Sequence, residues 1–207
     1  MDVSIFEVIF NAVYLITISL IVLTMNARVN LGYKLAFYSL ILGDIIHLGT
    51  RVSSILGDAT LIGYGNIAAS FSFTAFYIFL FIIWENGTSQ SKYDSWLVMG
   101  IILLIIIRCA ILTLPINNWG QYDLMCMIRN APLVLVQFIL GYKMIRDKLK
   151  IFNILGWMIV FSALCFSTAI VLLEQYPMIG MLMIPKTILY VCMAYFIRRH
   201  YVLGRKI

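Results

Sequence analysis

The sequence predicts an all-α polytopic membrane protein, a seven-transmembrane-helix bundle that forms a single domain over residues 1–207. Hydrophobic residues make up 63% of the 207 residues and charged residues only 12%, and mean hydropathy is +0.99. This composition lies outside the range of soluble globular domains. Apolar windows of ~19 residues, the length that crosses a hydrocarbon core of ~30 Å, recur along the whole chain. We therefore expect no soluble domain.

Seven apolar runs are long enough to serve as membrane spans. In chain order they cover roughly residues 4–25, 33–56, 62–84, 95–115, 126–143, 152–173 and 177–197. The first run is too long, and too thinly flanked by basic residues, to be a cleaved signal peptide. We expect it to remain as a permanent helix. Almost no sequence is left between the runs for linkers or extra modules.

The basic residues predict how the bundle is oriented. Eleven of the fifteen Lys and Arg fall in the odd-numbered loops and the C-terminal tail, at Arg28, Lys34, Lys92, Lys143, Arg146, Lys148, Lys150, Arg198, Arg199, Arg205 and Lys206. The even-numbered loops and the N-terminus are mainly acidic. By the positive-inside rule, the N-terminus lies outside and the C-terminus is cytoplasmic. The basic charge then indicates membrane lipids as partners, and it gives no reason to expect nucleic acid.

Four basic residues outside the loops and the tail, and one acidic residue, lie at membrane depth within the predicted spans. Asp44 and Lys186 lie near mid-depth, and Arg51, Arg108 and Arg129 lie in the outer half. A charge at such depth costs several kcal/mol unless it is paired or hydrated, so each is a functional candidate. One carboxylate can neutralise only one of the cations. The others need water, backbone carbonyls or an anionic ligand.

Helical geometry groups polar residues into stripes on the second and third spans. At 100° per residue, Asp44, His47 and Arg51 lie within about 60° of one another. On the third span a second stripe falls within about 80° and consists of Asn66, Ser70, Thr74 and Tyr77. Polar side chains in a bundle face inward, where they find partners. The alternatives are a structural interhelical network for the first stripe and close helix packing for the second.

Prolines mark the fifth and seventh spans. Arg129-Asn130-Ala131-Pro132 reads as a helix start, where proline is tolerated; capping or snorkelling at the outer interface is the alternative for Arg129. In the last span Lys186 and Tyr190 share one face. Pro185 beside the lysine deprives the Met181 carbonyl of its helical partner, so we expect a kink there.

Several chemistries can be set against these residues. A membrane zinc hydrolase needs about three ligands, and one histidine and one aspartate are available at depth, so we predict no metal site and no cofactor. Neither a nucleophile elbow nor a P-loop occurs. A retinal pigment would need a lysine in the last span, where Lys186 lies. It would also need a carboxylate on the third span; its absence leaves only Asp44 and disfavours this class.

Four strings carry a resemblance to a known family. They are Gly43 to Arg51, Leu114 to Trp119, Arg129 to Pro132 and Gly180 to Thr187. They resemble motifs of a small, functionally uncharacterised family of bacterial seven-helix integral membrane proteins, over most of the chain. One departure is the Gly49-Thr50 pair before Arg51, where that family has a proline. The resemblance implies no activity. It implies a bacterial inner-membrane location and one constellation formed by the motif residues.

Our leading hypothesis is a membrane protein that binds a small anionic or amphipathic ligand in an outward-facing polar cavity, as a carrier or receptor-like binder. The candidate ligand-binding residues are Asp44, His47, Arg51, Thr74, Tyr77, Arg129, Asn130, Lys186 and Tyr190. An intramembrane enzyme acting on a lipid or amphiphile is the alternative, with His47 as acid/base oriented by Asp44. A structural membrane subunit is the third. A binder leaves its ligand unchanged, whereas an enzyme shows turnover that His47→Ala abolishes.

Overall fold

The computed structural model describes residues 3–26, 28–58, 60–87, 95–117, 119 and 124–202. It is all-helical, with 86% helix and no strands among the described residues. The helices are α1 (Val3–Leu23), α2 (Leu31–Ile55), α3 (Ile62–Gly87), α4 (Ser95–Leu112), α5 (Leu124–Ile145), α6 (Lys150–Leu172) and α7 (Met183–Tyr201), with a 3-10 helix η2 (Pro177–Leu182) before α7. Each predicted span corresponds to one α-helix, except that the last is divided between η2 and α7.

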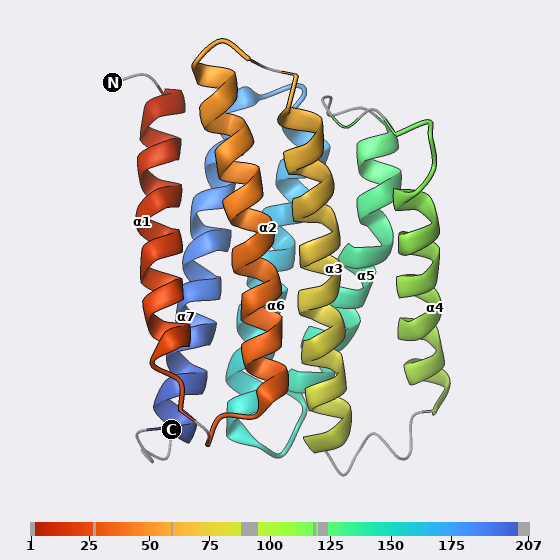
Figure 1. Cartoon of the computed structure of the whole chain (residues 1–207). Coiled ribbons are helices and arrows are strands. Elements are labelled where there is room, and N and C mark those ends of the chain that lie inside the picture. Colours follow the sequence, from red (N-terminus) through yellow and green to blue (C-terminus); the bar gives the residue numbers. More distant parts are fainter. Residues whose placement is uncertain are drawn as a thin grey trace.

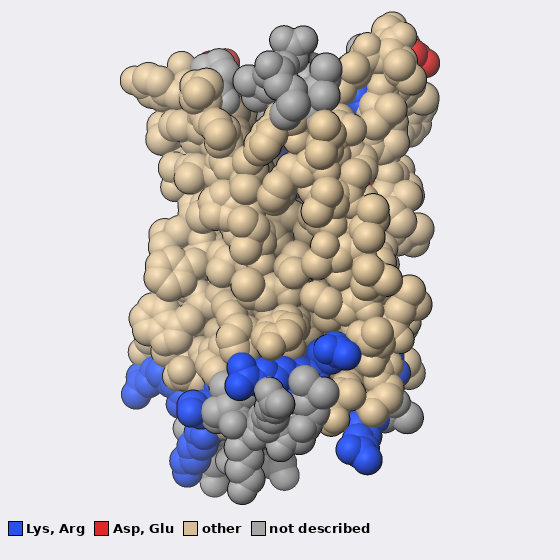
Figure 2. Space-filling view, turned by 90° about the vertical axis from the view of Figure 1, so that its left-hand side faces the viewer, with Lys and Arg blue, Asp and Glu red and all other residues tan. Residues whose placement is uncertain are grey.

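The outer surface is that of a multi-pass membrane protein. Five helical segments are long and apolar enough to cross a membrane, namely α2, α3, α5, α6 and the unit Met178–Tyr201. The apolar parts of α1 and α4 that count toward this measure are shorter, Val8–Leu23 and Trp96–Leu112. On the face seen in Figure 2, Lys and Arg gather at the end that carries the C-terminus, and the flank above them shows few charged side chains. Many large apolar side chains of the described helices are exposed. So broad an exposed apolar surface suits lipid rather than water.

Six of the helices close into a ring. Helix α1 packs on α2, α2 on α3, α3 on α5, α5 on α6, α6 on α7, and α7 on α1. Helix α4 lies outside this ring at the edge of the bundle, against α3 and α5 (Figure 1). Of its described side chains, only Ile101, Arg108 and Leu112 are buried. These three side chains therefore contribute much of the buried contact between α4 and the ring.

Small residues let neighbouring helices of the ring approach closely. A Cβ built on Gly156 of α6 would lie 2.6 Å from the Ile145 nitrogen and 2.7 Å from the Gly141 carbonyl oxygen of α5. A Cβ on Gly43 of α2 would collide with Ser72 of α3. In lipid, where no hydrophobic effect drives helices together, such close backbone packing supplies much of the attraction.

The turn between α2 and α3 is short and is stabilised by hydrogen bonds within it. Gly57 adopts a φ of +107°, which side-chain-bearing residues rarely adopt. The Asp58 carboxylate then accepts hydrogen bonds from the Thr60 amide at 3.0 Å and the Thr60 hydroxyl at 2.5 Å. These bonds, from the hydroxyl first, hold the pKa of Asp58 below its usual value.

Two expectations about proline are wrong. Helix α5 begins at Leu124, so Pro132 lies inside it rather than at its start. The last span does not kink at Pro185 within a continuous α-helix. It changes type instead, because η2 ends at Leu182 and α7 begins at Met183. Pro185 thus lies in the first turn of α7, where an amide hydrogen has no helical partner to lose.

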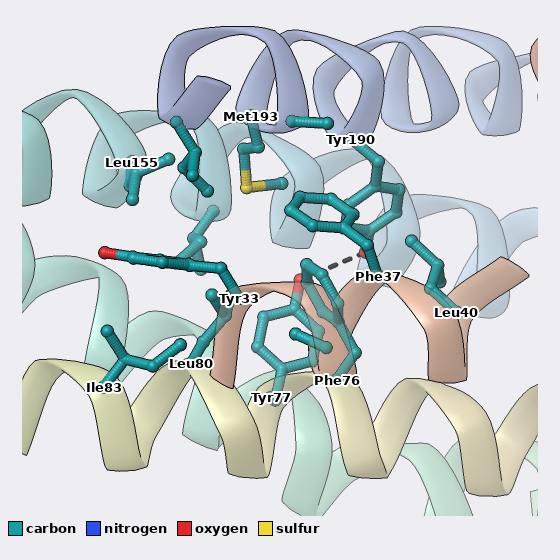
Figure 3. Close-up of a cluster of buried hydrophobic side chains, with 14 of the residues drawn as sticks. Tyr33, Phe37, Leu40, Phe76, Tyr77, Leu80, Ile83, Leu155, Tyr190 and Met193 are labelled. Carbon is teal, nitrogen blue, oxygen red and sulfur yellow. Dashed lines mark hydrogen bonds between the residues drawn. The ribbon is translucent and has the colours of Figure 1, made fainter. Parts of the chain in front are cut away.

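The half of the ring nearer the C-terminal end is filled by a hydrophobic core. Figure 3 shows part of this core, in which Tyr33, Phe37, Leu40, Phe76, Leu80, Leu155 and Met193 are packed together. Phe76 meets the Tyr77 and Tyr190 rings edge-to-face at 5.1 and 5.3 Å. The hydroxyl groups of Tyr77 and Tyr190 are hydrogen-bonded at 3.1 Å. This packing leaves the other half of the ring as the place for a cavity.

Candidate ligand-binding cavity

A cavity of about 460 Å³ lies in the half of the bundle nearer the start of α1. All six helices of the ring contribute to its lining, and so do α4 and η2. Volumes of this order accommodate drug-sized molecules. Seven of the nine predicted ligand-binding residues line it: Asp44, His47, Arg51, Arg129, Asn130, Lys186 and Tyr190.

Arg108 is the lining residue that sequence reasoning left out of the site. It belongs to α4, yet its side chain is 1% exposed and reaches the cavity between α3 and α5. Its Nε donates to the Thr74 hydroxyl at 2.8 Å. One terminal nitrogen donates to the Arg129 carbonyl at 2.7 Å and to Asn130 Oδ1 at 3.1 Å, and the other contacts the Ser70 carbonyl at 3.4 Å. The planar fork of arginine suits such divergent acceptors.

Helix α5 offers Arg108 two acceptors in the turn before Pro132, the Arg129 carbonyl and the Asn130 side chain. Proline has no amide hydrogen, so the Ile128 carbonyl, next to that of Arg129, receives no helical hydrogen bond from residue 132. The side chain of Asn130 is also fixed there, since it donates to the Cys126 carbonyl at 2.8 Å while its oxygen accepts from Arg108. The Arg129-to-Pro132 motif thus builds the seat for an arginine of another helix.

Arg129 points into the same cavity from α5. Its side chain is 5% exposed, and its guanidinium lies 4.7 Å from the centre of the Trp119 ring. Trp119 is itself fixed because its carbonyl accepts a hydrogen bond from Asn66 of α3. The stacked, buried position fits the predicted cavity role of Arg129 rather than the snorkelling alternative.

Lys186 faces the cavity from α7 with aromatic rings beside it. Its Nζ lies 4.1 Å from the centres of both Phe73 and Phe166, and the side chain is 5% exposed. Among the residues that the structure describes, none accepts a hydrogen bond from this ammonium. Two cation–π contacts offset only part of the cost of burying a charge. The side of the Lys186 ammonium that faces the cavity can therefore accept a further polar partner from a ligand.

Asp44 supplies the one carboxylate of the described lining. Its Oδ2 accepts a hydrogen bond from the Tyr14 hydroxyl of α1 at 2.9 Å. Asp44 and Lys186 interact electrostatically, but these two described residues form no direct salt bridge. His47, one turn further along α2, has its Nδ1 buried without a described hydrogen-bond partner. The predicted stripe of Asp44, His47 and Arg51 therefore faces a shared space.

Two predicted residues, Thr74 and Tyr77, lie next to the cavity without lining it. The Thr74 hydroxyl accepts from Arg108 and donates to the Ser70 carbonyl at 2.8 Å. Tyr77 is fully buried in the core and bonded to Tyr190, whose hydroxyl also accepts from Ser162 at 3.2 Å. Thr74 thus positions a cavity cation, and Tyr77 supports the cavity floor.

Comparison with family models, with curated proteins and with solved structures gives no match for this chain. Among the described residues, no cluster of three His, Cys, Asp or Glu side chains could hold a metal ion. The functional argument therefore depends on the cavity and its charges.

Proposed function

We propose that this chain is an integral membrane protein that binds a small anionic or amphipathic molecule in the cavity, as a carrier or receptor-like binder. One observation carries the proposal. Arg51, Arg108, Arg129 and Lys186 line one cavity of about 460 Å³, and Asp44 is the one carboxylate that faces them among the described residues. Among the described lining residues, side chains that carry positive charge therefore outnumber those that carry negative charge.

Such a surplus is unfavourable in an empty cavity and favourable around an anion. Charges interact more strongly where protein and lipid lower the dielectric constant than they do in water. Guanidinium groups bind carboxylate and phosphate through paired, charge-assisted hydrogen bonds. An anionic ligand would also give the Lys186 ammonium the acceptor that the described residues do not provide.

The proposal includes a topology. All seven helices cross the membrane, the N-terminus is outside, and the C-terminal end with its cluster of Lys and Arg faces the cytoplasm. The cavity lies in the half nearer the start of α1 and would then face outward. We place the protein in a bacterial inner membrane, in keeping with the family resemblance. The packed core of the opposite half supports a one-sided cavity rather than an open channel.

The two other hypotheses have less support. The enzyme hypothesis has Asp44 orient His47 as the acid/base, yet the described hydrogen bond of the Asp44 carboxylate comes from Tyr14. A purely structural subunit would pair its buried charges internally. Arg108 meets that description through its four acceptors, but Lys186 does not.

Binding of benzoate tests the proposal. With the protein in nanodiscs of zwitterionic lipid, we expect saturable binding of benzoate and none of benzyl alcohol, which has the same ring without the charge. The double variant Arg51→Gln, Arg129→Gln should bind benzoate at least about tenfold more weakly, the equivalent of ~1.4 kcal/mol. A matched variant at the opposite end, Lys148→Gln with Lys150→Gln, should bind as the wild type does. Equal benzoate affinity in all three proteins would contradict the proposal.

A further inference from the structure

We infer that the ligand is an amphiphile with one anionic head, held by α2, α3, α4 and α5, and an apolar body that lies along α6, η2, α7 and α1. This inference rests on the proposed function and narrows it. It follows from the way in which polar and apolar side chains divide between the two sides of the cavity.

The first side is the cationic wall, defined as the lining residues of α2, α3, α4 and α5. Arg51, Arg108 and Arg129 all belong to it. Neutral hydrogen-bonding groups stand among them, including Asn66 and Ser70 of α3. Asp44 also belongs to this wall, but its carboxylate is turned to the Tyr14 hydroxyl. Arg51 and Arg129 therefore offer guanidinium groups to one end of a ligand, and Arg108, which is bonded to α3 and α5, adds its positive charge to the same wall.

The second side is the apolar wall, defined as the lining residues of α6, η2, α7 and α1. Ile170 of α6, Leu173 just after it, Met183 and Ile184 of α7 and Leu15 of α1 present hydrocarbon or thioether surface. The neutral polar side chains of this wall are Asn11, Tyr14, Thr187 and Tyr190, of which Tyr14 is bonded to Asp44 and Tyr190 to Tyr77. Water against the hydrocarbon surface is unfavourable. A small hydrated anion would leave this wall wet, whereas an apolar body covers it.

Lys186 joins the two walls. It is the one charged side chain that the described lining of the apolar wall contains. Its ammonium lies between Phe73 of the cationic wall and Phe166 of the apolar wall, and it interacts electrostatically with Asp44 and Arg108. An anionic head seated against the arginines therefore lies within the field of Lys186 as well. The rings of Phe73 and Phe166 would then contact the ligand where its anionic head joins its apolar body.

The floor of the cavity limits how the body can extend. Tyr190 lines the cavity and is bonded to Tyr77, and Phe37 and Phe76 pack beside these two rings (Figure 3). The body cannot pass between these side chains toward the C-terminal end of the bundle. It must lie within the 460 Å³ of the cavity and toward the η2 side. A chain of medium length, rather than a long acyl chain, fits these limits.

A probe series separates the contributions of head and body. In the same nanodiscs, equilibrium binding of acetate, inorganic phosphate, decanoate, decyl phosphate and decanol would be measured. We expect decanoate or decyl phosphate to bind at least about tenfold more tightly than acetate or phosphate, and decanol to bind far more weakly. The better of the two decyl probes identifies a carboxylate or a phosphate head, since both suit guanidinium groups.

Adjacent positions on α6 provide a matched pair of variants. Ile170 lines the cavity and is 6% exposed, whereas Val171 is 50% exposed on the outer surface. Ile170→Ser should lower the affinity for decanoate several-fold more than the affinity for acetate, and the acetate binding that remains shows that the variant is folded. Val171→Ser should change neither affinity.

The outcomes distinguish this inference from the proposed function. Acetate or phosphate binding as tightly as the decyl probes would overturn the inference while the anion-binding function stands. Decanol binding as tightly as decanoate would overturn both, because charge would then contribute nothing. A decyl advantage that Ile170→Ser and Val171→Ser lower equally would place the body outside the cavity and would also overturn the inference.

Discussion

Arg108 Nε donates a hydrogen bond to the Thr74 hydroxyl at 2.8 Å, and this bond ties a helix outside the ring to the ring itself. The same guanidinium reaches two groups of α5, so one side chain fastens α4 to both of its neighbours. Among the described side chains of α4, only Ile101 and Leu112 are buried besides Arg108, so few others share this task. Arg108 thus contributes both to the attachment of α4 and to the charge of the cavity.

Arg108→Lys should therefore destabilise the protein even though it keeps the charge. An ammonium is a point donor and cannot reach acceptors on α3 and α5 together. We expect a loss of about 2 kcal/mol, from hydrogen bonds to a charged group that are no longer made. Thermal unfolding in one detergent measures this. The control Arg146→Lys, at an exposed arginine bonded only to Tyr142 in the described structure, should stay within about 0.5 kcal/mol of wild type. Equal melting temperatures of the two variants would show that Arg108 does not hold α4 to α3 and α5.

Gly156 should be intolerant of any side chain. A Cβ there would press on the Ile145 nitrogen and the Gly141 carbonyl at 2.6 and 2.7 Å, and backbone atoms cannot turn aside as a flexible side chain can. Overpacking of this kind costs about 1–3 kcal/mol. Gly156→Ala should lower the melting temperature. Gly100→Ala on α4, where nothing lies within 4 Å, should raise it slightly through helix propensity. A Gly156→Ala protein as stable as Gly100→Ala would show that α5 and α6 pack less closely than described.

The helices could be predicted from the sequence, and part of the site could be too. Apolar length alone gave all seven segments, because the bilayer imposes it. Helical periodicity brought Asp44, His47 and Arg51 to one face, and this face lines the cavity. Arg108 was recognised as a charge at depth but not as a site residue. Its place depends on α4 lying outside the ring, and apolar runs contain no information on that order.

Other parts depended on tertiary contacts that no spacing reveals. Thr74 and Tyr77 belong to the predicted polar stripe of α3. The Thr74 hydroxyl, however, is hydrogen-bonded to Arg108 and the Tyr77 hydroxyl to Tyr190, so neither lines the cavity. The change from η2 to α7 ahead of Pro185 was missed because the preference of proline for a first helical turn and its capacity to kink a helix look alike in sequence.

Asp44 and Lys186 should couple energetically. They interact through the cavity without direct contact, so removing one leaves the other less compensated, and removing both restores part of the balance. Asp44→Asn should therefore destabilise the protein more than Asp44→Asn combined with Lys186→Met. A double-mutant cycle of unfolding free energies measures the coupling, for which we expect roughly 0.5–3 kcal/mol. Strict additivity would show that the two charges do not sense each other.

The proposed orientation can be read from the chain ends. The Lys and Arg cluster at the C-terminal end predicts that this end is cytoplasmic. A reporter that is active only in the cytoplasm should be active when fused after the last residue. A second reporter, active only outside, should be active when placed in the α2–α3 turn near Gly57. The reverse pattern at both sites would turn the cavity toward the cytoplasm.

The central claim is that the cavity holds an anion, and native mass spectrometry of the gently purified protein tests it most directly. We predict that the wild type carries a small molecule which, once released, is identified as an acid, and that the Arg51→Gln, Arg129→Gln variant has lost it. A neutral or cationic occupant, or equal occupancy by the same acid in the variant, would contradict the claim.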